Sequence, residues 1–446
     1  MAIEVCTLGG FSDTGRNSTA IKIDDEVVIL DMGLHMENYI QHTEDREDIS
    51  AKTYEELLKV KALPDYHAIK EWKEKVVAII PSHGHLDHVG AVPFAAPLFP
   101  KAPIICTPYT AEVLKTIFLD EKIKVPNQLI SLNLNSSYKI SKNITVELLE
   151  ITHSIPHTAM VILHTPYGLL VYANDYKFDR HPILGKKPNF ERLEELGKEG
   201  VRLLIVESLY ADLHRKTPSE SVAQQMLNDV MLGINSEHKA MIVTTFSSHI
   251  ARLKSIVEFG KKMNRKVIFL GRSLSKYVTA AENIQLVHFS QDIKVVKYQD
   301  KVAQELKHIS KDKGKYLLVT TGHQGEPKAV LSKLARGELP FHFEKGDIVV
   351  FSCSIIPVEL NQNNRERLER QLTSQGVRIF RDIHVSGHAS REDHRDLLEL
   401  LKPKYVIPAH AGYEKAKHIA SLAIEMDIPA KNVFLMENGK KISIPD

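Results

Sequence analysis

The chain has 446 residues, 43% of them hydrophobic and 26% charged, with a formal net charge of +2. This length exceeds the size at which a single hydrophobic core stops growing, so we expect two domains. The nearly balanced charge excludes a uniformly basic nucleic-acid binder, so a polyanion would need a local basic channel or metal ions. No apolar run approaches the ~20 residues that span a bilayer, and we expect neither a membrane segment nor a signal peptide.

Three cysteines, Cys6, Cys106 and Cys353, lie far apart in the sequence. Their odd number and wide spacing fit buried thiols in a reducing compartment better than disulfides or a cysteine-based metal site. We therefore expect a cytoplasmic protein. The 22 histidines are many for this length, and their grouping carries the functional information.

The first part of the chain has the pattern of short strands, because β-branched stretches are closed by Gly, Asp or Pro. The predicted strands are 3–8, 19–23, 27–31, 76–81, 104–106, 144–151, 160–163, 169–172 and 201–207. Helical periodicity predicts one helix at 110–122. The charge-rich segment 36–75 has a partly helical pattern and is too long for a simple connection.

From about residue 208 the pattern changes to an alternation of strands and helices, which is typical of a parallel α/β domain. The predicted strands are 240–246, 267–270, 316–321 and 347–352, and the helices that follow them are 249–262, 274–281, 326–335 and 358–374. The chain then returns to helix 391–401, strand 405–408, helix 415–426 and a closing strand at 433–435. No Gly/Ser linker separates these parts, so we predict that domain 208–382 is inserted into a domain formed by 1–207 and 383–446.

The most specific motif is the string PSHGHLDH at residues 81–88, directly after a predicted apolar strand. Three imidazoles and one carboxylate within six residues form a compact nitrogen and oxygen ligand set, which suits Zn²⁺ and related ions. Alternate residues of such a loop face two neighbouring ions. We expect His83 and His85 at one ion, and Asp87 and His88 at the other. The alternative is a solvated polar loop, but a random occurrence has a probability of about a few in a thousand.

This string resembles the signature of the metallo-β-lactamase superfamily, an αββα sandwich, and the resemblance implies further ligands in chain order. These are His153 at the first ion, Asp175 bridging both ions and His410 at the second, while Asp31 orients a ligand histidine. Each residue taken singly would more often be a surface or hydrogen-bonded core residue. His157 competes with His153, but the His-Ser-Ile-Pro string favours His153. The implied cofactor is two divalent ions, Zn²⁺ with Mn²⁺ as the alternative, which together generate hydroxide at neutral pH.

The inserted block and the distal motifs resemble the β-CASP branch of that superfamily, whose members act on nucleic acids. On this resemblance Glu207 is the acidic residue at a strand end, and His388 pairs with it. An imidazole held by a carboxylate beside the metals can protonate the leaving 3′-oxygen. We therefore expect Asp87, Glu207 and His388 to be catalytic, with a buried structural pair as the alternative for the last two.

Further strings narrow the resemblance to the RNase J family and cover essentially the whole chain. They are TTFSS at 244–248, GRS at 271–273, TGHQGEP at 321–327 and the stretch 384–393. In that family such loops hold the terminal phosphate of a nucleotide, which here implies Ser248, His384, Val385, Ser386, Gly387 and His388. Hydroxyls, imidazoles and exposed backbone N–H groups can hold a phosphate dianion, although ordinary loop polarity is the alternative. Residues 322–326 also open a predicted helix, whose N-terminus is a second candidate for a backbone phosphate.

Within the family the chain resembles the compact archaeal-type enzymes, because it stops at Asp446 without the further C-terminal domain of the bacterial ones. Two positions depart from the family pattern. An Ala-His-Ala-Gly-Tyr string surrounds His410 where His-Gly-Glu is commoner, and Asn174 replaces a usual glycine. Neither departure removes a ligand, but both change the surroundings of the metal site.

The expected function is a metal-dependent 5′-to-3′ exoribonuclease that binds single-stranded RNA by a 5′-monophosphate end and releases mononucleotides. A β-CASP endoribonuclease or a DNA-processing nuclease is the alternative, and it needs an open channel without an end pocket. The long insertion between Glu207 and His384 opposes a small-molecule hydrolase, and the complete ligand set opposes a non-enzymatic scaffold. The family resemblance and the extra segment 36–75 lead us to expect a homodimer, with a mobile loop or a lid over the RNA as the alternative role for that segment.

Overall fold

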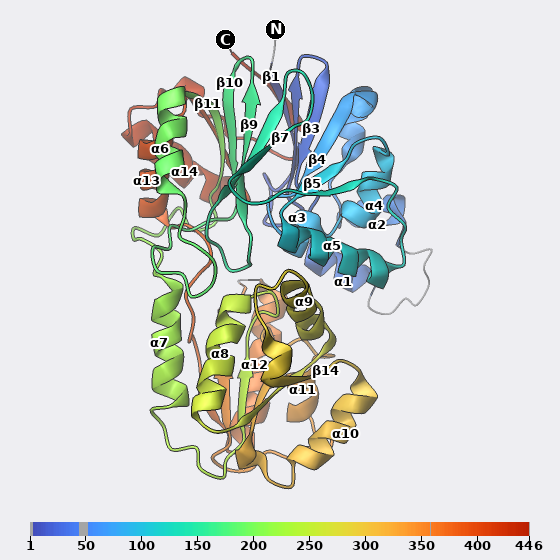
Figure 1. Cartoon of the computed structure of the whole chain (residues 1–446), viewed down its shortest axis with the longest axis vertical. Coiled ribbons are helices and arrows are strands. Elements are labelled where there is room, and N and C mark those ends of the chain that lie inside the picture. Colours follow the sequence, from blue (N-terminus) through green and yellow to red (C-terminus); the bar gives the residue numbers. More distant parts are fainter. Residues whose placement is uncertain (1–2, 44–51, 357, 446) are drawn as a thin grey trace. The chain divides into compact units, whose positions relative to one another are not determined.

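The computed structural model describes residues 3–43, 52–356 and 358–445 of the chain (Figure 1). The chain forms two compact units. Unit 1 comprises Met1–Arg180, Lys186–Thr217 and Gly387–Asp446, and unit 2 comprises His181–Gly185 and Pro218–Ser386. The predicted domain limits are 207/208 and 382/383, whereas the chain passes between the two units mainly at 217/218 and 386/387.

Unit 1 contains two sheets among its described residues, with orders β19-β1-β2-β3-β4-β5-β6 and β18-β11-β10-β9-β8-β7. The strands of the first are β1 (Ile3–Gly9), β2 (Ser18–Ile23), β3 (Glu26–Leu30), β4 (Val76–Ile80), β5 (Ile104–Cys106), β6 (Leu129–Ser131) and β19 (Lys440–Ile444). Those of the second are β7 (Ser136–Lys139), β8 (Thr145–Glu150), β9 (Ala159–Thr165), β10 (Gly168–Ala173), β11 (Val201–Glu207) and β18 (Tyr405–Ala409). Side chains from both sheets, among them Val5, Ile80, Leu163 and Ile407, form one buried cluster, so the central core lies between the sheets.

Helices cover the outer face of each sheet in unit 1 (Figure 1). On the first sheet lie α1 (Met36–Thr43), α2 (Tyr54–Lys59), η2 (Tyr66–Lys75), α3 (Leu86–Val89), α4 (Val92–Ala95), η3 (Ala96–Leu98) and α5 (Pro108–Glu121). The second carries α6 (Phe190–Glu199), α13 (Arg391–Leu401) and α14 (Tyr413–Glu425). Leu193, Leu397 and Ile419 of these last helices pack against Val171 and Leu204 of the sheet. Because successive strand residues face opposite sides, each sheet is buried on both faces, and the result is the predicted αββα sandwich.

Unit 2 contains a parallel sheet of order β14-β13-β15-β12-β16-β17. Its strands are β12 (Met241–Thr244), β13 (Lys266–Leu270), β14 (Ile293–Val296), β15 (Tyr316–Thr320), β16 (Ile348–Phe351) and β17 (Arg378–Phe380). Its helices are α7 (Glu220–Met231), α8 (Ile250–Lys262), α9 (Arg272–Asn283), α10 (Gln299–Ile309), α11 (Val330–Ala335) and α12 (Glu359–Ser374). Ile268 and Leu318 meet α10, α11 and α12 on one face, while Gly260 of α8 lies against Val267 and Leu317 on the other. Helices on both faces explain why the strands are continuous apolar runs.

Two predicted elements are wrong. The helix predicted at 326–335 is only α11 (Val330–Ala335), because Gly322 and Gly325 adopt left-handed φ angles of 111° and 79° and keep the preceding residues in turns. Residues 322–326 therefore open no helix and offer no helix N-terminus to a phosphate. The closing strand is β19, which pairs with β1, whereas Val433 makes only an isolated bridge to Val406.

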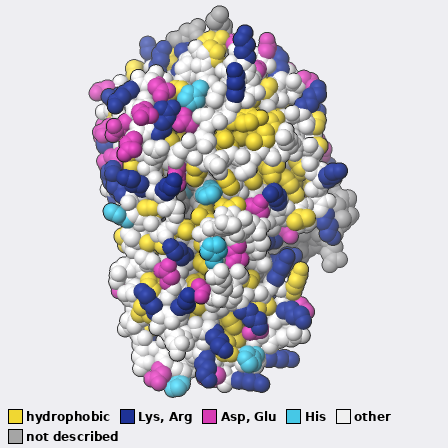
Figure 2. Space-filling model, in the orientation of Figure 1, with side chains coloured by type: hydrophobic (Ala, Val, Ile, Leu, Met, Phe, Trp, Pro, Cys, Tyr) yellow, Lys and Arg dark blue, Asp and Glu magenta, His cyan; other side chains and the backbone are white. Residues whose placement is uncertain are grey.

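Four further observations concern expectations drawn from composition and from the segment 36–75. Cys6, Cys106 and Cys353 are buried and free, as predicted. In the described part of the chain, no helix is long and apolar enough to cross a membrane. Of the segment 36–75, residues 44–51 lie outside the described residues, and the rest forms α1, α2 and η2. On the face drawn in Figure 2, Lys and Arg side chains are interspersed with Asp and Glu, as the small net charge predicts.

Candidate metal centre

Seven side chains that the motifs single out come together in unit 1 as two groups that share one carboxylate. The first group is His83, His85, His153 and Asp175, and the second is Asp87, His88, Asp175 and His410. Within each group the ligand atoms all lie within 4.8 Å of one another. His83, His85, Asp87 and His88 share one loop, whereas His153, Asp175 and His410 come from three other parts of the chain, so the fold brings these four parts together.

Strand ends place these side chains. The PSHGHLDH string follows the buried strand β4, and His85 is the N-cap of the short helix α3, so Asp87 and His88 lie on its first turn. Asp31, Asp175 and His410 follow β3, β10 and β18 with left-handed φ angles of 57°, 60° and 59°. Such backbone is uncommon for residues other than glycine, and strain of this kind is concentrated at functional sites.

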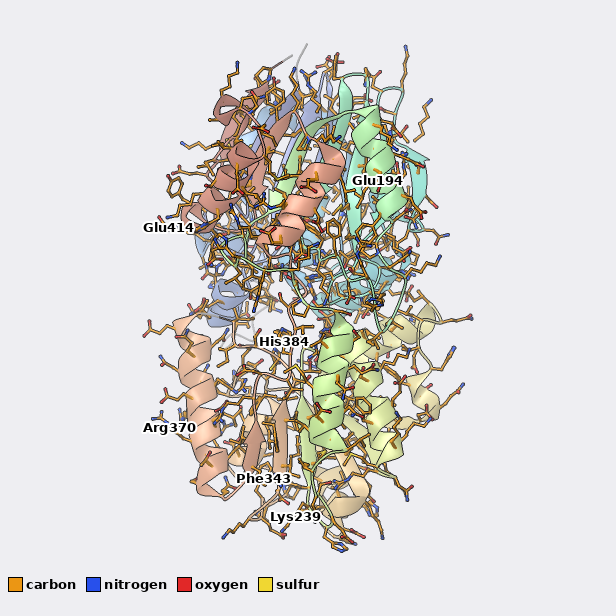
Figure 3. All side chains as sticks on the ribbon, turned by 90° about the vertical axis from the view of Figure 1, so that its left-hand side faces the viewer. Glu194, Lys239, Phe343, Arg370, His384 and Glu414 are labelled. Carbon is orange, nitrogen blue, oxygen red and sulfur yellow. The ribbon has the colours of Figure 1, made fainter. Side chains whose placement is uncertain are left out.

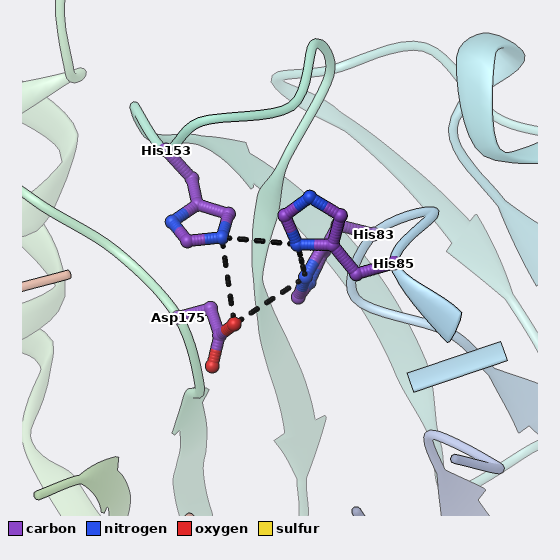
Figure 4. A group of neighbouring side chains, drawn as sticks. All are labelled: His83, His85, His153 and Asp175. Atoms are coloured by element: carbon purple, nitrogen blue, oxygen red, sulfur yellow. Dashed lines mark hydrogen bonds and ion pairs between the residues drawn. The ribbon is translucent and has the colours of Figure 1, made fainter. Parts of the chain in front are cut away.

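In the first group one nitrogen each of His83 and His153 faces the same oxygen of Asp175, and a nitrogen of His85 faces those two nitrogens (Figure 4). Nε2 of His83 and Nε2 of His153 lie 3.5 Å and 3.4 Å from Asp175 Oδ2. His85 Nδ1 lies 3.1 Å from His83 Nε2 and 3.2 Å from His153 Nε2. Burial lowers the pKa of His85 to about 4 and holds those of His83 and His153 well below their ordinary value. The three rings are therefore neutral, which is the form that binds a metal.

The second group faces the same carboxylate from the other side. His88 Nε2 lies 3.3 Å from Asp175 Oδ2 and 3.4 Å from Asp87 Oδ2. His410 Nε2 lies 3.4 Å from Asp175 Oδ1 and 3.9 Å from Asp87 Oδ2. Both oxygens of Asp175 thus face imidazole nitrogens, which suits a carboxylate shared between two cations.

In His83, His88 and His153 the ring nitrogen that points away from Asp175 has a hydrogen-bond partner of its own. Nδ1 of His88 donates to Asp31 Oδ2 at 2.7 Å, and Nδ1 of His153 donates to the Gly387 carbonyl at 2.7 Å. Nδ1 of His83 lies 3.0 Å from Ser82 Oγ. Partners of this kind set the tautomer and leave Nε2 with its lone pair free for a metal. Asp31 itself accepts hydrogen bonds from Ser82 N and from the Tyr172 hydroxyl at 2.6 Å and 2.8 Å.

The residues present fit a divalent cation. Asp175 is 1% exposed, and neither of its oxygens has a hydrogen-bond partner among the described residues. An ionised carboxylate buried in this way is costly unless a cation compensates it. The donor set contains only imidazole nitrogen and carboxylate oxygen, which matches Zn²⁺ or Mn²⁺ and excludes a cysteine-based site.

A second imidazole–carboxylate pair lies beside the two groups. His388 Nδ1 lies 2.8 Å from Glu207 Oε2, and His388 Nε2 lies 4.0 Å from Asp175 Oδ2. The other oxygen of Glu207 accepts from the backbone N–H groups of Tyr176 and Ala389 at 3.0 Å and 3.2 Å. Burial opposes the charged imidazole, but the carboxylates of Glu207 and Asp175 raise the pKa of His388 to about 9. The Nδ1–H of His388 therefore faces Glu207, and its Nε2 faces the shared carboxylate.

The residues predicted for a phosphate pocket are divided between the units. Ser248, His384, Val385 and Ser386 belong to unit 2, and Gly387 and His388 to unit 1. In unit 2 His384 lies at the carboxyl ends of the parallel strands, whereas Lys239 and Phe343, which precede β12 and β16, lie at the opposite end (Figure 3). Ligands of parallel α/β sheets bind at the carboxyl ends of the strands.

In unit 1 Gly387 touches the metal groups directly. A Cβ atom at Gly387 would lie 2.8 Å from His153 Nδ1 and 2.8 Å from Ser154 N. The absence of a side chain therefore lets the Gly387 carbonyl reach His153. This contact is a further role for a residue that the motifs assign only to phosphate binding.

Three further residues of the site were not predicted: Asn17 and Ser82 contact ligands, and Tyr172 contacts Asp31. Asn17 Oδ1 accepts from His410 Nδ1 at 2.8 Å. The available signal was the pair Gly9-Gly10 directly after the first predicted strand, because glycine at a strand end often marks a close approach of backbone. Tyr172 carries no such signal, since its position in an apolar strand is also that of a core residue.

The chain is similar to known protein families and to individual relatives. Three family models match, described as "Beta-lactamase superfamily domain" at residues 57–185, "Ribonuclease J, beta-CASP domain" at 238–369 and "Zn-dependent metallo-hydrolase RNA specificity domain" at 377–436. The chain is 44% identical over 446 residues to a ribonuclease J of Pyrococcus abyssi, covering 99% of this chain and 97% of the relative. It is 43% identical over 446 residues to a ribonuclease J of Methanocaldococcus jannaschii, covering 99% of each.

More distant similarities cover the same length. A ribonuclease J 1 of Streptococcus pyogenes is 32% identical, and the match covers 99% of this chain and 74% of the relative. A crystal structure of a protein of unknown function from Enterococcus faecalis superposes with a TM-score of 0.67 at 17% identity, covering 99% of this chain and 100% of that chain. The last similarity concerns the fold alone.

Proposed function

Because this chain belongs to the ribonuclease J family, we propose that it is a metal-dependent ribonuclease that degrades single-stranded RNA from its 5′ end. The family, the fold class and the hydrolytic activity that the motifs predict are confirmed by the full-length relatives and the family models. The observation that carries the proposal is the buried Asp175 carboxylate, which faces imidazole nitrogens of both groups and His388 Nε2.

The proposed cofactor is a pair of divalent ions. His83, His85 and His153 would hold one ion, Asp87, His88 and His410 the other, and Asp175 both. Two bound divalent ions lower the pKa of a coordinated water and neutralise charge that develops on the phosphate. We propose Zn²⁺ because most of the donors are imidazoles, with Mn²⁺ as the other outcome of an elemental analysis.

The chain's own residues supply the proton in this proposal. A water oxygen attacks phosphorus and releases a proton to solvent, the bond from phosphorus to the 3′-oxygen breaks, and the leaving oxygen takes the proton from His388 Nε2, which regains a proton from solvent. Glu207 holds the ring by its Nδ1–H and stabilises the charged form before the transfer. The released nucleotide keeps its 5′-phosphate and gains a 3′-hydroxyl, and the shortened RNA begins with a new 5′-monophosphate.

Recognition of the 5′ end is assigned to the loops with phosphate-binding chemistry. They contain Ser248, His384, Val385, Ser386, Gly387 and His388. Hydroxyls, imidazoles and the N–H of a glycine can together hold a phosphate dianion. A 5′-triphosphate carries extra bulk and charge, and a 5′-hydroxyl lacks the anchoring contacts, so the monophosphate end is the preferred substrate.

A time course on RNA that carries a label in the base of its first nucleotide tests this function. Three substrates of one sequence carry a 5′-monophosphate, a 5′-triphosphate or a 5′-hydroxyl. We expect labelled mononucleotide to appear first, and fastest from the monophosphate. Internal fragments released at equal rates from all three substrates would instead identify an endonuclease.

We also propose a homodimer in the cytoplasm. The helices α1, α2 and η2 of the segment 36–75 add surface that a minimal sandwich does not need, and the three cysteines are free thiols. Sedimentation equilibrium at micromolar concentration tests the dimer, and a single monomeric species would contradict it.

A further inference from the structure

We infer that Asn17 is a positioning residue for the second ligand group, defined as Asp87, His88, Asp175 and His410, and that the ion of this group depends on it selectively. The inference rests on the proposed two-ion function. Asn17 lies at the end of the loop between β1 and β2, far in the sequence from the ligands it contacts.

One amide side chain contacts three of the four ligands in this group. Its oxygen Oδ1 accepts a hydrogen bond from His410 Nδ1 at 2.8 Å. Its nitrogen Nδ2 donates to the Asp87 carbonyl at 3.1 Å, and lies 3.5 Å from Asp87 Oδ2 and 3.2 Å from His88 Nε2. Asn17 thus spans the ligands that come from α3 and from the end of β18.

These contacts fix the orientation of the amide and the tautomer of His410. The Asp87 carbonyl can only accept, so the NH₂ end of Asn17 must point toward it. The amide oxygen then faces His410 and can only accept, which requires the proton of the neutral ring on Nδ1. His410 Nε2 is left with its lone pair directed to Asp175 Oδ1 at 3.4 Å, as a metal ligand requires.

The backbone around Asn17 is built to admit this side chain. Asn17 is 1% exposed, and its N–H donates to the Asp87 carbonyl at 2.9 Å. A Cβ atom at Gly10, where φ is 85°, would lie 2.3 Å from Asn17 Oδ1, and one at Gly33 would lie 2.4 Å from Asn17 N. Both neighbours must therefore be glycine for Asn17 to reach its partners.

The first ligand group is held by other atoms. Ser82 Oγ lies beside His83 Nδ1, and the Gly387 carbonyl accepts from His153 Nδ1. Losing such an outer partner weakens metal binding by about 10- to 100-fold. We therefore expect Asn17→Ala to lower the affinity of the second ligand group for its ion by that factor. The affinity of the first ligand group should not change.

The test measures metal content rather than activity. Purified wild-type chain and Asn17→Ala are loaded with Zn²⁺ and equilibrated with graded concentrations of a chelator, and bound zinc per chain is measured by elemental analysis. We expect the wild type to release both zinc ions only at high chelator concentration. The variant should release one of its two ions at a lower chelator concentration. Asn17→Asp keeps the acceptor for His410 but loses the donor to Asp87, so it should release its second zinc at a higher chelator concentration than Asn17→Ala does.

A matched control separates this effect from a general loss of stability. Asn127 is another buried asparagine of unit 1, whose amide donates to the Phe99 and Ala102 carbonyls, and Asn127→Ala should retain both ions. If Asn17→Ala does not fold, Asn17→Ser, which is too short to reach His410, replaces it with the same expected loss. Two ions of unchanged affinity in the Ala or Ser variant would overturn the inference alone, and so would an Asn17→Asp variant that loses its second zinc as early as Asn17→Ala does. A wild-type chain that holds a single ion would overturn the two-ion function as well.

Discussion

Glu207 Oε2 accepts a 2.8 Å hydrogen bond from His388 Nδ1, and this bond turns His388 Nε2 toward Asp175. If His388 protonates the leaving oxygen, its loss must slow the chemical step more than it weakens RNA binding. We expect His388→Ala to lower kcat by about 100- to 10,000-fold with little change in KM.

Glu207→Gln is the companion variant of this first prediction. A glutamine keeps the volume but removes the charge that stabilises the protonated ring, so kcat should fall by less than in His388→Ala. Single-turnover rates and RNA affinity are measured together. An equal loss of affinity and rate would assign the pair to structure instead.

The second prediction concerns the ligands. Asp87→Ala or His85→Ala should abolish cleavage while RNA binding survives, because the ligands hold the ions that carry the chemistry. Exhaustive chelation of the wild type should have the same effect, and added Zn²⁺ or Mn²⁺ should restore cleavage. Full activity in a metal-free sample, verified by elemental analysis, would refute a metal-dependent mechanism.

The third prediction concerns end recognition. His384→Ala should reduce the preference for a 5′-monophosphate over a 5′-hydroxyl end more than it slows cleavage of a bound end, because His384 supplies positioning. The ratio of kcat/KM for the two substrates is the measurement. His308→Ala, a change at an exposed histidine of α10, serves as the control and should keep the wild-type ratio. An unchanged ratio in His384→Ala would remove His384 from the pocket.

The fourth prediction concerns a buried ion pair in unit 2. Arg252 is 0% exposed, donates to both oxygens of Glu220 at 2.5 Å and 2.9 Å, and also donates to the carbonyls of Ser352 and Ile383. Arg252→Met removes both of these hydrogen bonds from the buried Glu220 charge and leaves it the more distant His249 Nε2 at 3.4 Å, which should lower the free energy of unfolding by about 3–5 kcal/mol.

The double variant Arg252→Met, Glu220→Leu should recover part of this loss, because it leaves no unpaired charge. Denaturant unfolding of the wild type and the single and double variants measures the cycle. A double variant that is less stable than Arg252→Met would show that the pair itself, rather than the isolated charge, dominates.

The fifth prediction concerns pH. Burial opposes the charged carboxylate of Glu147, but hydrogen bonds from His164 and Arg192 lower its pKa to about 2. A folded-state pKa below the unfolded value adds stability that is complete above about pH 4.5 and is lost as the pH falls toward 2. Glu147→Gln should therefore cost about 1–2 kcal/mol at pH 7, allowing for solvent screening, and nothing near pH 2. A cost that stays constant over this range would attribute the effect to packing.

The sequence alone predicted the features that depend on neighbours along the chain. The PSHGHLDH string places four ligands within six residues after an apolar strand, so their proximity needs no tertiary information. Strands β12, β13, β15 and β16 of unit 2 are largely apolar runs and were predicted for the same reason, whereas β14 and β17, with IKVV and RIF, were not predicted. Family resemblance supplied His153, Asp175 and His410, whose local patterns are those of ordinary polar residues.

Other features depended on contacts between distant segments. β19 has only two apolar residues, Ile442 and Ile444, and it becomes a strand because β1 offers a free edge at the start of the chain. The predicted helix N-terminus at 322–326 failed because helical periodicity does not register the left-handed backbone of Gly322 and Gly325.

Tertiary structure also decided which polar atoms meet at the metal centre. Asn17 lies 70 residues from Asp87 and 393 from His410 in the sequence, yet one amide bonds to both. The local sequence pattern indicates which side chains are buried and whether the segment has helical or strand periodicity. Many side chains share these properties, so the pattern does not identify bonding partners. The tautomer of a ligand histidine depends instead on a single acceptor placed within 3 Å of one ring nitrogen, and only the packing of both sheets and their connecting loops sets that distance.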